Sequence, residues 1–292
     1  MHKNSTIMEL ERELAIAKQA ARAAGEKILE VYYSNNLDVT IKDGDQPVTR
    51  ADKAANDCLC LILHKAFPDY GILTEEIVET PSLSLQAALD EWRERRHAWI
   101  IDPLDGTKDF IKRNGEFGVH IGLTCDGEPV LGVNYYPTMD GLFYYAIKGQ
   151  GAYKEFAGGI AREKPERIHV SSISVFESMR IAVSTATHND QLRAFLDGTK
   201  FKEVVTLGSL GLKLCKVAEG FIDVYPNLLK LSSLWDTCSG QVIVEEAGGR
   251  LTDGRGQRID YRQQGKTNLE YGIAVSNGTK HDQLVALMAK HL

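Results

Sequence analysis

The chain has 292 residues, of which 43% are hydrophobic and 25% are charged, and its formal net charge is −6. This is the composition of a globular protein with room for one large domain or two smaller ones. A negative charge without a basic cluster argues against binding of a nucleic acid polymer. No apolar run is long enough to span a bilayer, and the five scattered cysteines favour reduced thiols, so we expect a cytoplasmic protein without a membrane segment.

The first hundred residues show apolar residues at a helical spacing, interrupted by turns. Thr49 is the expected N-cap of a helix that carries Asp52 in its first turn. A short strand is expected to end at Glu75 and Glu76. The predicted elements are helices over residues 8–34, 49–67 and 82–95, a strand over 72–74, and an apolar strand from residue 99 onward.

From residue 117 to 153 the pattern changes to apolar runs separated by turns, which predicts an antiparallel meander. A loop over residues 154–167 follows, and strands then alternate with helices. The predicted strands lie at 180–184, 204–207, 221–225 and near 250 and 272, and the predicted helices at 189–197, 209–219, 235–247 and 279–291. We therefore expect an α+β domain over residues 1–165 and an α/β domain over residues 166–292.

The most informative segment is the strand that begins at Trp99 and leads into Asp102-Pro103-Leu104-Asp105-Gly106-Thr107. The end of an apolar strand is a rigid place from which to project carboxylates, and Asp-Pro-x-Asp-Gly is expected to bend the chain. Two oxygen ligands three residues apart suit Mg²⁺, Mn²⁺ or Ca²⁺ better than zinc. The alternative is an aspartate-rich turn that caps a helix at Thr107.

Further carboxylates stand at the ends of predicted elements, where functional groups are often found. They are Asp52, Glu75, Glu76 and Asp236. Each alone has an ordinary alternative, because acidic residues favour the first turn of a helix and strand ends are often solvated. Together with Asp102 and Asp105 they would form a polynuclear Mg²⁺ site that polarises a phosphate ester and activates water. The N–H groups of Gly106 and Thr107, at a helix start, would hold the phosphate.

Four segments, in this order along the chain, resemble the motifs of the inositol monophosphatase superfamily of Mg²⁺-dependent, Li⁺-sensitive phosphatases. They are Pro47–Asp52, Ile72–Glu76, Asp102–Thr107 and Leu234–Gly249. The resemblance spans nearly the whole chain. It implies the layered αβαβα sandwich of that superfamily, which combines the α+β and α/β patterns described above.

The resemblance also implies a role for each matching residue. The first metal ion would be held by Glu75, Asp102 and the carbonyl of Leu104, the second by Asp102, Asp105 and Asp236, and a weaker third by Asp52 and Glu75. Thr107, together with Glu75 or Asp52, would orient the attacking water. Two or three Mg²⁺ ions are implied, with Mn²⁺ as a substitute and with Ca²⁺ and Li⁺ as inhibitors.

Within the superfamily, the segment Lys108–Phe117 resembles the bacterial CysQ-type 3′(2′),5′-bisphosphate nucleotidases, and so does the stretch Val217–Gly220. Lys213 falls where this subgroup has a lysine, and its charge could hold a second phosphate. The alternative is a surface lysine on a helix. The residues expected to contact the substrate are Gly106, Thr107, Ser184, His188, Lys213 and Asp236.

Two departures from the subgroup concern the second phosphate. The arginine that usually follows Ser184 is absent from Thr185-Ala186-Thr187-His188, and Gly208-Ser209-Leu210-Gly211 replaces Gly-Ser-Ser. His188 is a candidate replacement as a phosphate contact, and its alternative is a capping or surface residue. Lys112 and Arg113 are further cations expected near the mouth of the site.

We therefore predict a Mg²⁺-dependent phosphomonoesterase that converts adenosine 3′,5′-bisphosphate to AMP and phosphate, with its sulfated form (PAPS) as a further substrate. One alternative is an inositol monophosphatase or a broad sugar phosphatase. Against the inositol substrate, Tyr225 is followed by Pro226-Asn227-Leu228, where inositol monophosphatases usually have an acidic residue. Another alternative is a catalytically silent metal- or nucleotide-binding module, although no expected ligand is replaced. A small-molecule phosphate ester is the expected partner, and monomer and homodimer both remain open.

Overall fold

The computed structural model describes residues 10–42, 46–76, 82–157, 164–185, 190–228, 232–263 and 267–291. A seven-stranded sheet has the strand order β3-β4-β5-β6-β7-β8-β9, and a five-stranded sheet has the order β11-β10-β12-β14-β13. The strands of the first sheet are β3 (Gly71–Thr74), β4 (His97–Asp105), β5 (Gly118–Cys125), β6 (Glu128–Tyr136), β7 (Leu142–Ile147), β8 (Gly151–Phe156) and β9 (Glu166–Ile168). Those of the second are β10 (Arg180–Ser184), β11 (Glu203–Leu207), β12 (Val224–Asn227), β13 (Arg250–Asp253) and β14 (Ile273–Ser276).

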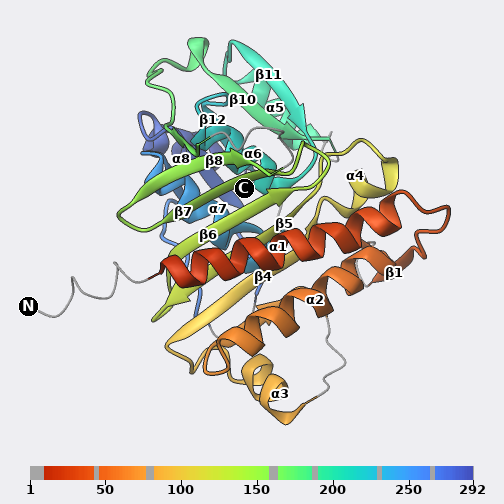
Figure 1. Cartoon of the computed structure of the whole chain (residues 1–292). Helices are drawn as coiled ribbons and strands as arrows, with labels where there is room; N and C mark the ends of the chain where they lie inside the picture. The colour runs from red at the N-terminus through yellow and green to blue at the C-terminus, as the bar shows by residue number, and fades with distance from the viewer. Residues whose placement is uncertain are drawn as a thin grey trace, which may run out of the picture.

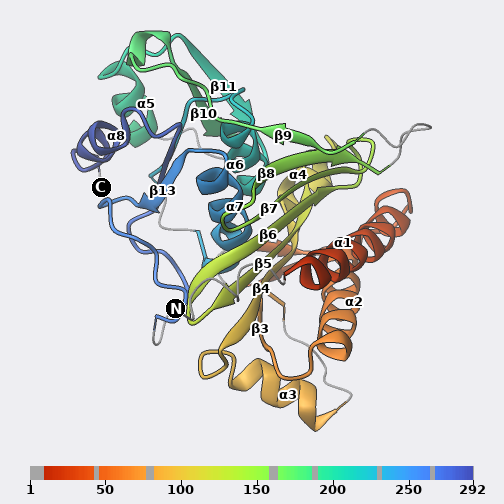
Figure 2. The same cartoon turned by 60° about the vertical axis from the view of Figure 1, so that its left-hand side comes forward.

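The helices form three layers around these two sheets (Figure 1). They are α1 (Glu11–Tyr32), α2 (Arg50–Ala66), α3 (Leu83–Asp90), α4 (Thr107–Lys112), α5 (Asp190–Asp197), α6 (Leu210–Ala218), α7 (Leu234–Glu246) and α8 (His281–Met288), with a 3₁₀ turn, η2 (Phe176–Ser178). Helices α1 and α2 cover one face of the first sheet, and α6 and α7 lie between the two sheets. Figure 2 shows α5 and α8 on the outer side of the second sheet. The predicted αβαβα sandwich is confirmed. A small hairpin of β1 (Thr40–Lys42) and β2 (Gln46–Val48) precedes α2.

Helix α1 lies flat against the first sheet because its buried face consists of small residues. Ala17, Ala20, Ala21 and Ala24 recur at the spacing of one helical face, and all four are fully buried. Helix α2 packs beside α1 through Ala51, Ala55 and Leu59. The two helices therefore complete a core against the aromatic and branched residues of β4 to β7.

Helix α7 is buried on almost every side because it packs against both sheets. It approaches β6 so closely that a Cβ atom at Gly132 would collide with the backbone carbonyl of Ser239. The core between the sheets includes Ile100 and Tyr144 from the first sheet and Val242 from α7. The predicted division near residue 165 stays a prediction, and β9, which follows it in sequence, completes the first sheet.

The predicted elements are present in the predicted order, with differences at their boundaries. The strand expected over 221–225 begins later, at Val224, and runs to Asn227. The helix expected over 82–95 ends at Asp90, and Trp92 then packs closely against Gly71. The loop expected over 154–167 begins later, because β8 continues to Phe156, and it ends earlier, at β9. The strand from Trp99 does not end before the aspartates but runs through them to Asp105. Among the described residues, no helix has both the length and the apolar character needed to cross a membrane.

Candidate functional site

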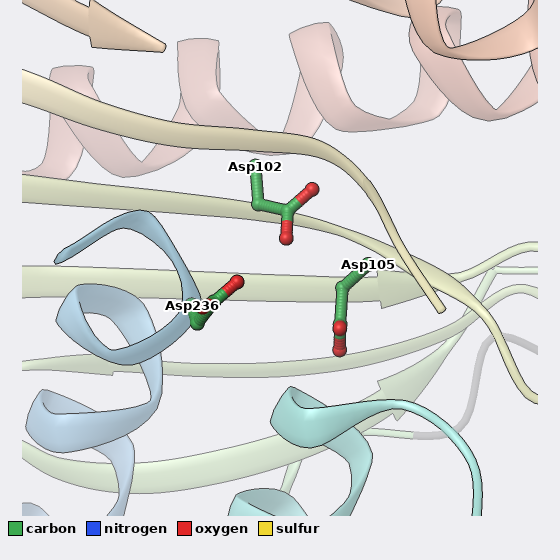
Figure 3. Close-up of side chains that lie close together, drawn as sticks. All are labelled: Asp102, Asp105 and Asp236. Atoms are coloured by element: carbon green, nitrogen blue, oxygen red, sulfur yellow. The ribbon is translucent and has the colours of Figure 1, made fainter. Parts of the chain in front are cut away.

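Three aspartates from distant parts of the chain meet at one end of the first sheet. Asp102 and Asp105 lie on β4, and Asp236 lies in the first turn of α7. Each offers a carboxylate oxygen that lies within 4.8 Å of an oxygen of the other two. Figure 3 shows the three carboxylates converging on one space, with Asp236 entering from the start of α7.

The geometry of β4 explains how two aspartates three residues apart reach the same space. Asp102 pairs with His120 and Asp105 with Gly118, so two residues of β4 lie opposite one residue of β5. This is a β-bulge, and it contains Pro103, which has no N–H to offer to the sheet. The predicted bend at Asp-Pro-x-Asp is therefore a bulge inside a strand, and the side chain of Asp102 accepts a hydrogen bond from the Leu104 N–H at 3.0 Å.

Asp236 is held by the start of its own helix. Ser233 is the N-cap of α7, and its N–H donates to Asp236 Oδ2 at 2.5 Å in a capping box. Asp105 is held by groups from elsewhere: Oδ2 accepts hydrogen bonds from Ser209 Oγ and from the Gly211 N–H at 2.8 Å. The first-turn position predicted for Asp236 is thus confirmed.

The buried carboxylates repel one another, and the groups around them do not neutralise their negative charge. Burial, followed by repulsion from Glu75 and Asp105, raises the pKa of Asp102 well above its ordinary value. Burial and repulsion from Asp105 and Glu75 likewise raise the pKa of Asp236. A bound divalent cation would neutralise this charge, and an oxygen-only donor set suits a hard cation such as Mg²⁺. The residues therefore fit a metal site.

Glu75 lies beside the three aspartates because β3 is parallel to β4. Thr74 pairs with Ile101, and the Glu75 N–H donates to the Ile101 carbonyl at 3.3 Å. Glu75 therefore follows β3 at the level of Asp102. It is outside the group of three, although its charge acts on both Asp102 and Asp236.

Asp52 and Thr107 form a hydrogen bond that joins the starts of α2 and α4. Asp52 Oδ2 accepts hydrogen bonds from the Thr49 N–H at 2.7 Å and from Thr49 Oγ1 at 2.6 Å, in the capping box of α2. Its other oxygen accepts the hydroxyl of Thr107 at 3.0 Å. Burial raises the pKa of Asp52 to about 6, against the opposing effect of these hydrogen bonds. Thr107 Oγ1 also lies 3.2 Å from the Leu104 carbonyl.

A short helix begins at Thr107, as the capped-turn alternative also expected. Its N-cap is Gly106, which has a φ of 90° and makes no side-chain cap. Neither aspartate of the motif caps this helix, so that alternative does not explain them. A Cβ at position 106 would lie 2.7 Å from the Glu116 carbonyl, so the close turn requires glycine.

A cleft of about 230 Å³ opens over the three aspartates. The predicted site residues Glu75, Asp102, Leu104, Asp105, Gly106, Thr107, Ser184, Lys213 and Asp236 line this cleft. Asp52, Glu76 and Lys112 do not line it, although Asp52 accepts a hydrogen bond from the cleft residue Thr107. Ser184 reaches it from the end of β10, and Lys213 from α6. His188 lies outside the described residues.

Lys213 is not the surface lysine of the alternative interpretation, because it is only 1% exposed. Its ammonium donates to the carbonyls of Leu207 at 3.2 Å, Gly208 at 2.5 Å and Ser209 at 3.0 Å. Burial lowers its pKa to about 8, despite the nearby carboxylates. Lys213 thus brings charge to the wall of the cleft while its N–H groups bind the backbone.

Arg113 does not face the cleft. Its guanidinium donates to the carbonyls of Tyr32 and Ser34 at the end of α1, so the mouth position expected for it is wrong. The residues that contact Asp105, namely Ser209, Gly211 and His120, were not predicted as site residues. The available signals for Ser209 and Gly211 were the start of a helix at residue 209 and the departure from the nucleotidase subgroup over residues 208–211.

The sequence model that describes the inositol monophosphatase family matches residues 9–292 of this chain. The chain belongs to the inositol monophosphatase family. It is 37% identical over 247 residues to the 3′(2′),5′-bisphosphate nucleotidase CysQ of Salmonella typhimurium, covering 83% of this chain and 91% of that protein. It is 36% identical over 262 residues to the Escherichia coli protein of the same name, covering 88% and 97% respectively.

Solved structures of the inositol monophosphatase family have the same fold. The extragenic suppressor protein suhB of Bartonella henselae superposes with a TM-score of 0.76 and 28% identity, covering 97% of this chain and all of that one. CysQ of Bacteroides thetaiotaomicron gives a TM-score of 0.74 and 29% identity, covering 92% and 99%. The family is metal-dependent, which agrees with the acidic cluster. The resemblance of the four sequence motifs to this family is confirmed.

Proposed function

We propose that the protein is a Mg²⁺-dependent phosphomonoesterase that removes the 3′-phosphate of adenosine 3′,5′-bisphosphate to give AMP and phosphate. We include the sulfated form, PAPS, as a second substrate. The substrate class is supported by the similarity to the two bacterial bisphosphate nucleotidases over more than four fifths of the chain. The chemistry is supported by one arrangement, in which the three aspartates and Thr107 line one cleft and Thr107 donates a hydrogen bond to Asp52.

The proposed ligands are Asp102, Asp105, Asp236, Glu75 and the carbonyl of Leu104, with Asp52 and Glu75 at a weaker third position. Bound Mg²⁺ would neutralise the phosphate, lower the pKa of the attacking water and stabilise the leaving oxygen. Mn²⁺ is the expected substitute, and Ca²⁺ and Li⁺ are the expected inhibitors. We base the choice of a hard cation on the oxygen-only donor set.

The Asp52–Thr107 pair is suited to orienting water. The Thr107 hydroxyl donates its proton to Asp52, so its lone pairs remain to accept a proton from a water molecule in the cleft. The oxygen of that water would attack phosphorus in line with the departing sugar oxygen. One proton would pass through Thr107 to Asp52, the carboxylate that accepts the Thr107 hydroxyl.

We place the transferred phosphate at the start of α4, where Gly106 and Thr107 line the cleft and their N–H groups would serve as helix-terminal donors. Ser184 and Asp236 line the same cleft and are the proposed contacts to the sugar. The charge of Lys213 would attract the second phosphate from the wall of the cleft. His188 stays a predicted phosphate contact.

The competing substrate is inositol 1-phosphate or another sugar phosphate. At the end of β12, Asn227 lines the cleft, where an inositol phosphatase usually has a carboxylate to bind hydroxyl groups. An amide binds hydroxyl groups less strongly than a carboxylate, which weakens the case for a polyol substrate. A catalytically silent module is disfavoured because all the expected ligand residues are present in the sequence and three of them, Asp102, Asp105 and Asp236, converge.

The test is phosphate release by the purified chain with Mg²⁺ and adenosine 3′,5′-bisphosphate, PAPS, inositol 1-phosphate or fructose 1,6-bisphosphate. We expect the highest kcat/KM for the 3′,5′-bisphosphate. A tenfold preference for inositol 1-phosphate would contradict the nucleotidase proposal, and no release from any ester would favour the silent module.

The metal assignment is tested by Asp105→Asn. Loss of one ligand charge should lower kcat/KM by about 100-fold or more, because the cation that stabilises the leaving oxygen is bound more weakly. Asp140→Asn is the matched control, since Asp140 lies in the exposed turn between β6 and β7 and asparagine also tolerates its φ of 53°. A kcat near that of the wild type in Asp105→Asn would overturn the assignment.

A further inference from the structure

The carboxylate of Asp105 is oriented by groups outside its own strand. Ser209 Oγ and the Gly211 N–H, 2.8 Å away, both donate to Oδ2. His120 Nε2 lies 3.5 Å from the same oxygen, and the His120 side chain is fully buried. Within the described part of the chain, the two hydrogen bonds to the Asp105 side chain both go to Oδ2, and His120 Nε2 lies near that oxygen without forming a hydrogen bond. We therefore take Oδ1 as the oxygen that Asp105 presents to the space shared with Asp102 and Asp236.

The start of α6 is shaped for this close approach. Ser209 is the N-cap of α6, so its oxygen accepts the Leu212 N–H at 3.0 Å while its proton is directed to Asp105. A Cβ at Gly211 would collide with the ring of His120, and any side chain there would push the helix away from Asp105. The positive end of the helix also favours a carboxylate at this position.

The backbone just before α6 is held in place by the buried side chain of Lys213. Lys213 donates to three successive carbonyls, those of residues 207–209, and it is buried in doing so. The ammonium therefore clamps the backbone from which the hydroxyl of Ser209 projects. A residue with a fixed backbone and a single proton to donate defines the direction of its hydrogen bond closely.

We propose that Ser209 is a positioning residue for the metal ligand Asp105. By occupying Oδ2, Ser209 and the Gly211 N–H would make Asp105 a one-oxygen ligand that presents Oδ1 to the cation. This inference rests on the proposed metal site but does not depend on which phosphate ester is hydrolysed. It also assigns the N-terminus of α6, which lines the substrate cleft, to the metal site.

The experiment is calorimetric titration of the full chain with Mg²⁺ alone, without substrate. Ser209→Ala removes the proton donor and the helix cap, whereas Ser209→Gly removes the donor but costs little as a cap. Both variants should bind Mg²⁺ about 10–100-fold more weakly than the wild type, the usual effect of removing a partner of a metal ligand. Ser209→Thr keeps the hydroxyl and should restore most of the affinity.

The matched control is Ser239→Ala, a buried serine in α7 whose hydroxyl makes no hydrogen bond within the described residues. It should bind Mg²⁺ like the wild type. Mg²⁺ affinity within twofold of the wild type in a folded Ser209→Gly would overturn the proposal. So would a deficit found in Ser209→Ala but not in Ser209→Gly, since that would reflect capping alone. If the nucleotidase proposal alone is wrong, the chain will bind Mg²⁺ as expected, and the phosphate-release assay will show no preference for the 3′,5′-bisphosphate.

Discussion

Asn56 is a buried residue that links two of the proposed catalytic carboxylates. It lies one helical turn after Asp52 in α2. Its Oδ1 accepts the hydroxyl of Thr74 at 2.5 Å, and its Nδ2 donates to the carbonyl of Glu76 at 3.4 Å. The residues on both sides of Glu75 are therefore tied to the helix that carries Asp52.

We predict that Asn56→Ala lowers kcat/KM by about tenfold, because the turn that carries Glu75 loses its anchor to α2. The variant should also lose roughly 1–3 kcal/mol of unfolding free energy, since buried polar groups lose their partner. Kinetics at saturating Mg²⁺ and thermal unfolding measure the two effects separately. Lys53→Ala, on the exposed side of the same helix, is the control. A stability loss with unchanged kcat/KM would show that Asn56 is structural only.

At the scale of single residues, the sequence predicted the proposed metal ligands better than the residues that hold those ligands in position. Asp102, Asp105 and Asp236 belong to recognisable motifs near the end of β4 and at the start of α7, and the structure brings them together. The contact of Ser209 with Asp105 spans 104 positions, and that of Asn56 with Glu76 spans 20. Such contacts depend on how helices pack, and no local pattern encodes them. Lys213 was predicted to be near the site, but its burial against three carbonyls was not.

At the scale of elements, strong periodicity made most of the helices and strands predictable. The alanines of α1 and the short apolar run of β10 leave little choice of secondary structure. Boundaries were less predictable where tertiary contacts decide them. Helix α3 ends early because Trp92 packs on Gly71, and β4 continues through Pro103 because a bulge absorbs the missing N–H.

The close packing of α7 against β6 depends on one glycine of β6, Gly132. Gly132→Ala would place a Cβ against the carbonyl of Ser239, so α7 has to move away from the sheet. Because α7 carries Asp236, we expect weaker Mg²⁺ binding as well as a loss of about 1–3 kcal/mol in unfolding free energy. Calorimetric titration and urea unfolding test this. Gly198→Ala is the control, since its nearest neighbour would be 3.3 Å away in an exposed position. If Gly132→Ala has the Mg²⁺ affinity and unfolding free energy of the wild type, α7 can move away from β6 without weakening the metal site.

At the scale of the whole molecule, the site is built where the layers meet. Asp102 and Asp105 come from the first sheet, Asp236 from the central helices, and Ser184 from the second sheet. A cation bound between these layers would favour the assembled state over any state in which they separate. Binding of such a cation would therefore link the geometry of the site to the stability of the sandwich.

The far side of the second sheet holds a buried histidine that couples the stability of the whole chain to pH. His281 Nε2 lies 2.9 Å from Thr252 Oγ1, which donates its own proton to the Asp253 carbonyl. His281 Nδ1 lies 2.9 Å from Ser276 Oγ. This network suits a neutral ring with its proton on Nε2. Burial, with a smaller effect of Arg250, lowers the pKa of His281 to about 4, and the charge of Asp282 opposes the shift.

Because the ordinary pKa of histidine is about 6.5, the unfolded chain binds a proton at this residue between pH 6.5 and 4 while the folded chain does not. The unfolding free energy should therefore fall as the pH drops through this window, by about 2 kcal/mol between pH 7 and pH 5. His281→Gln removes the titrating group and should show a correspondingly smaller slope in urea unfolding at pH 7, 6 and 5, whatever its stability at pH 7. The exposed His169→Gln serves as the control and should keep the wild-type slope. An unchanged slope in His281→Gln would mean that another group carries the pH dependence and that the charged ring is accommodated between β13, β14 and α8.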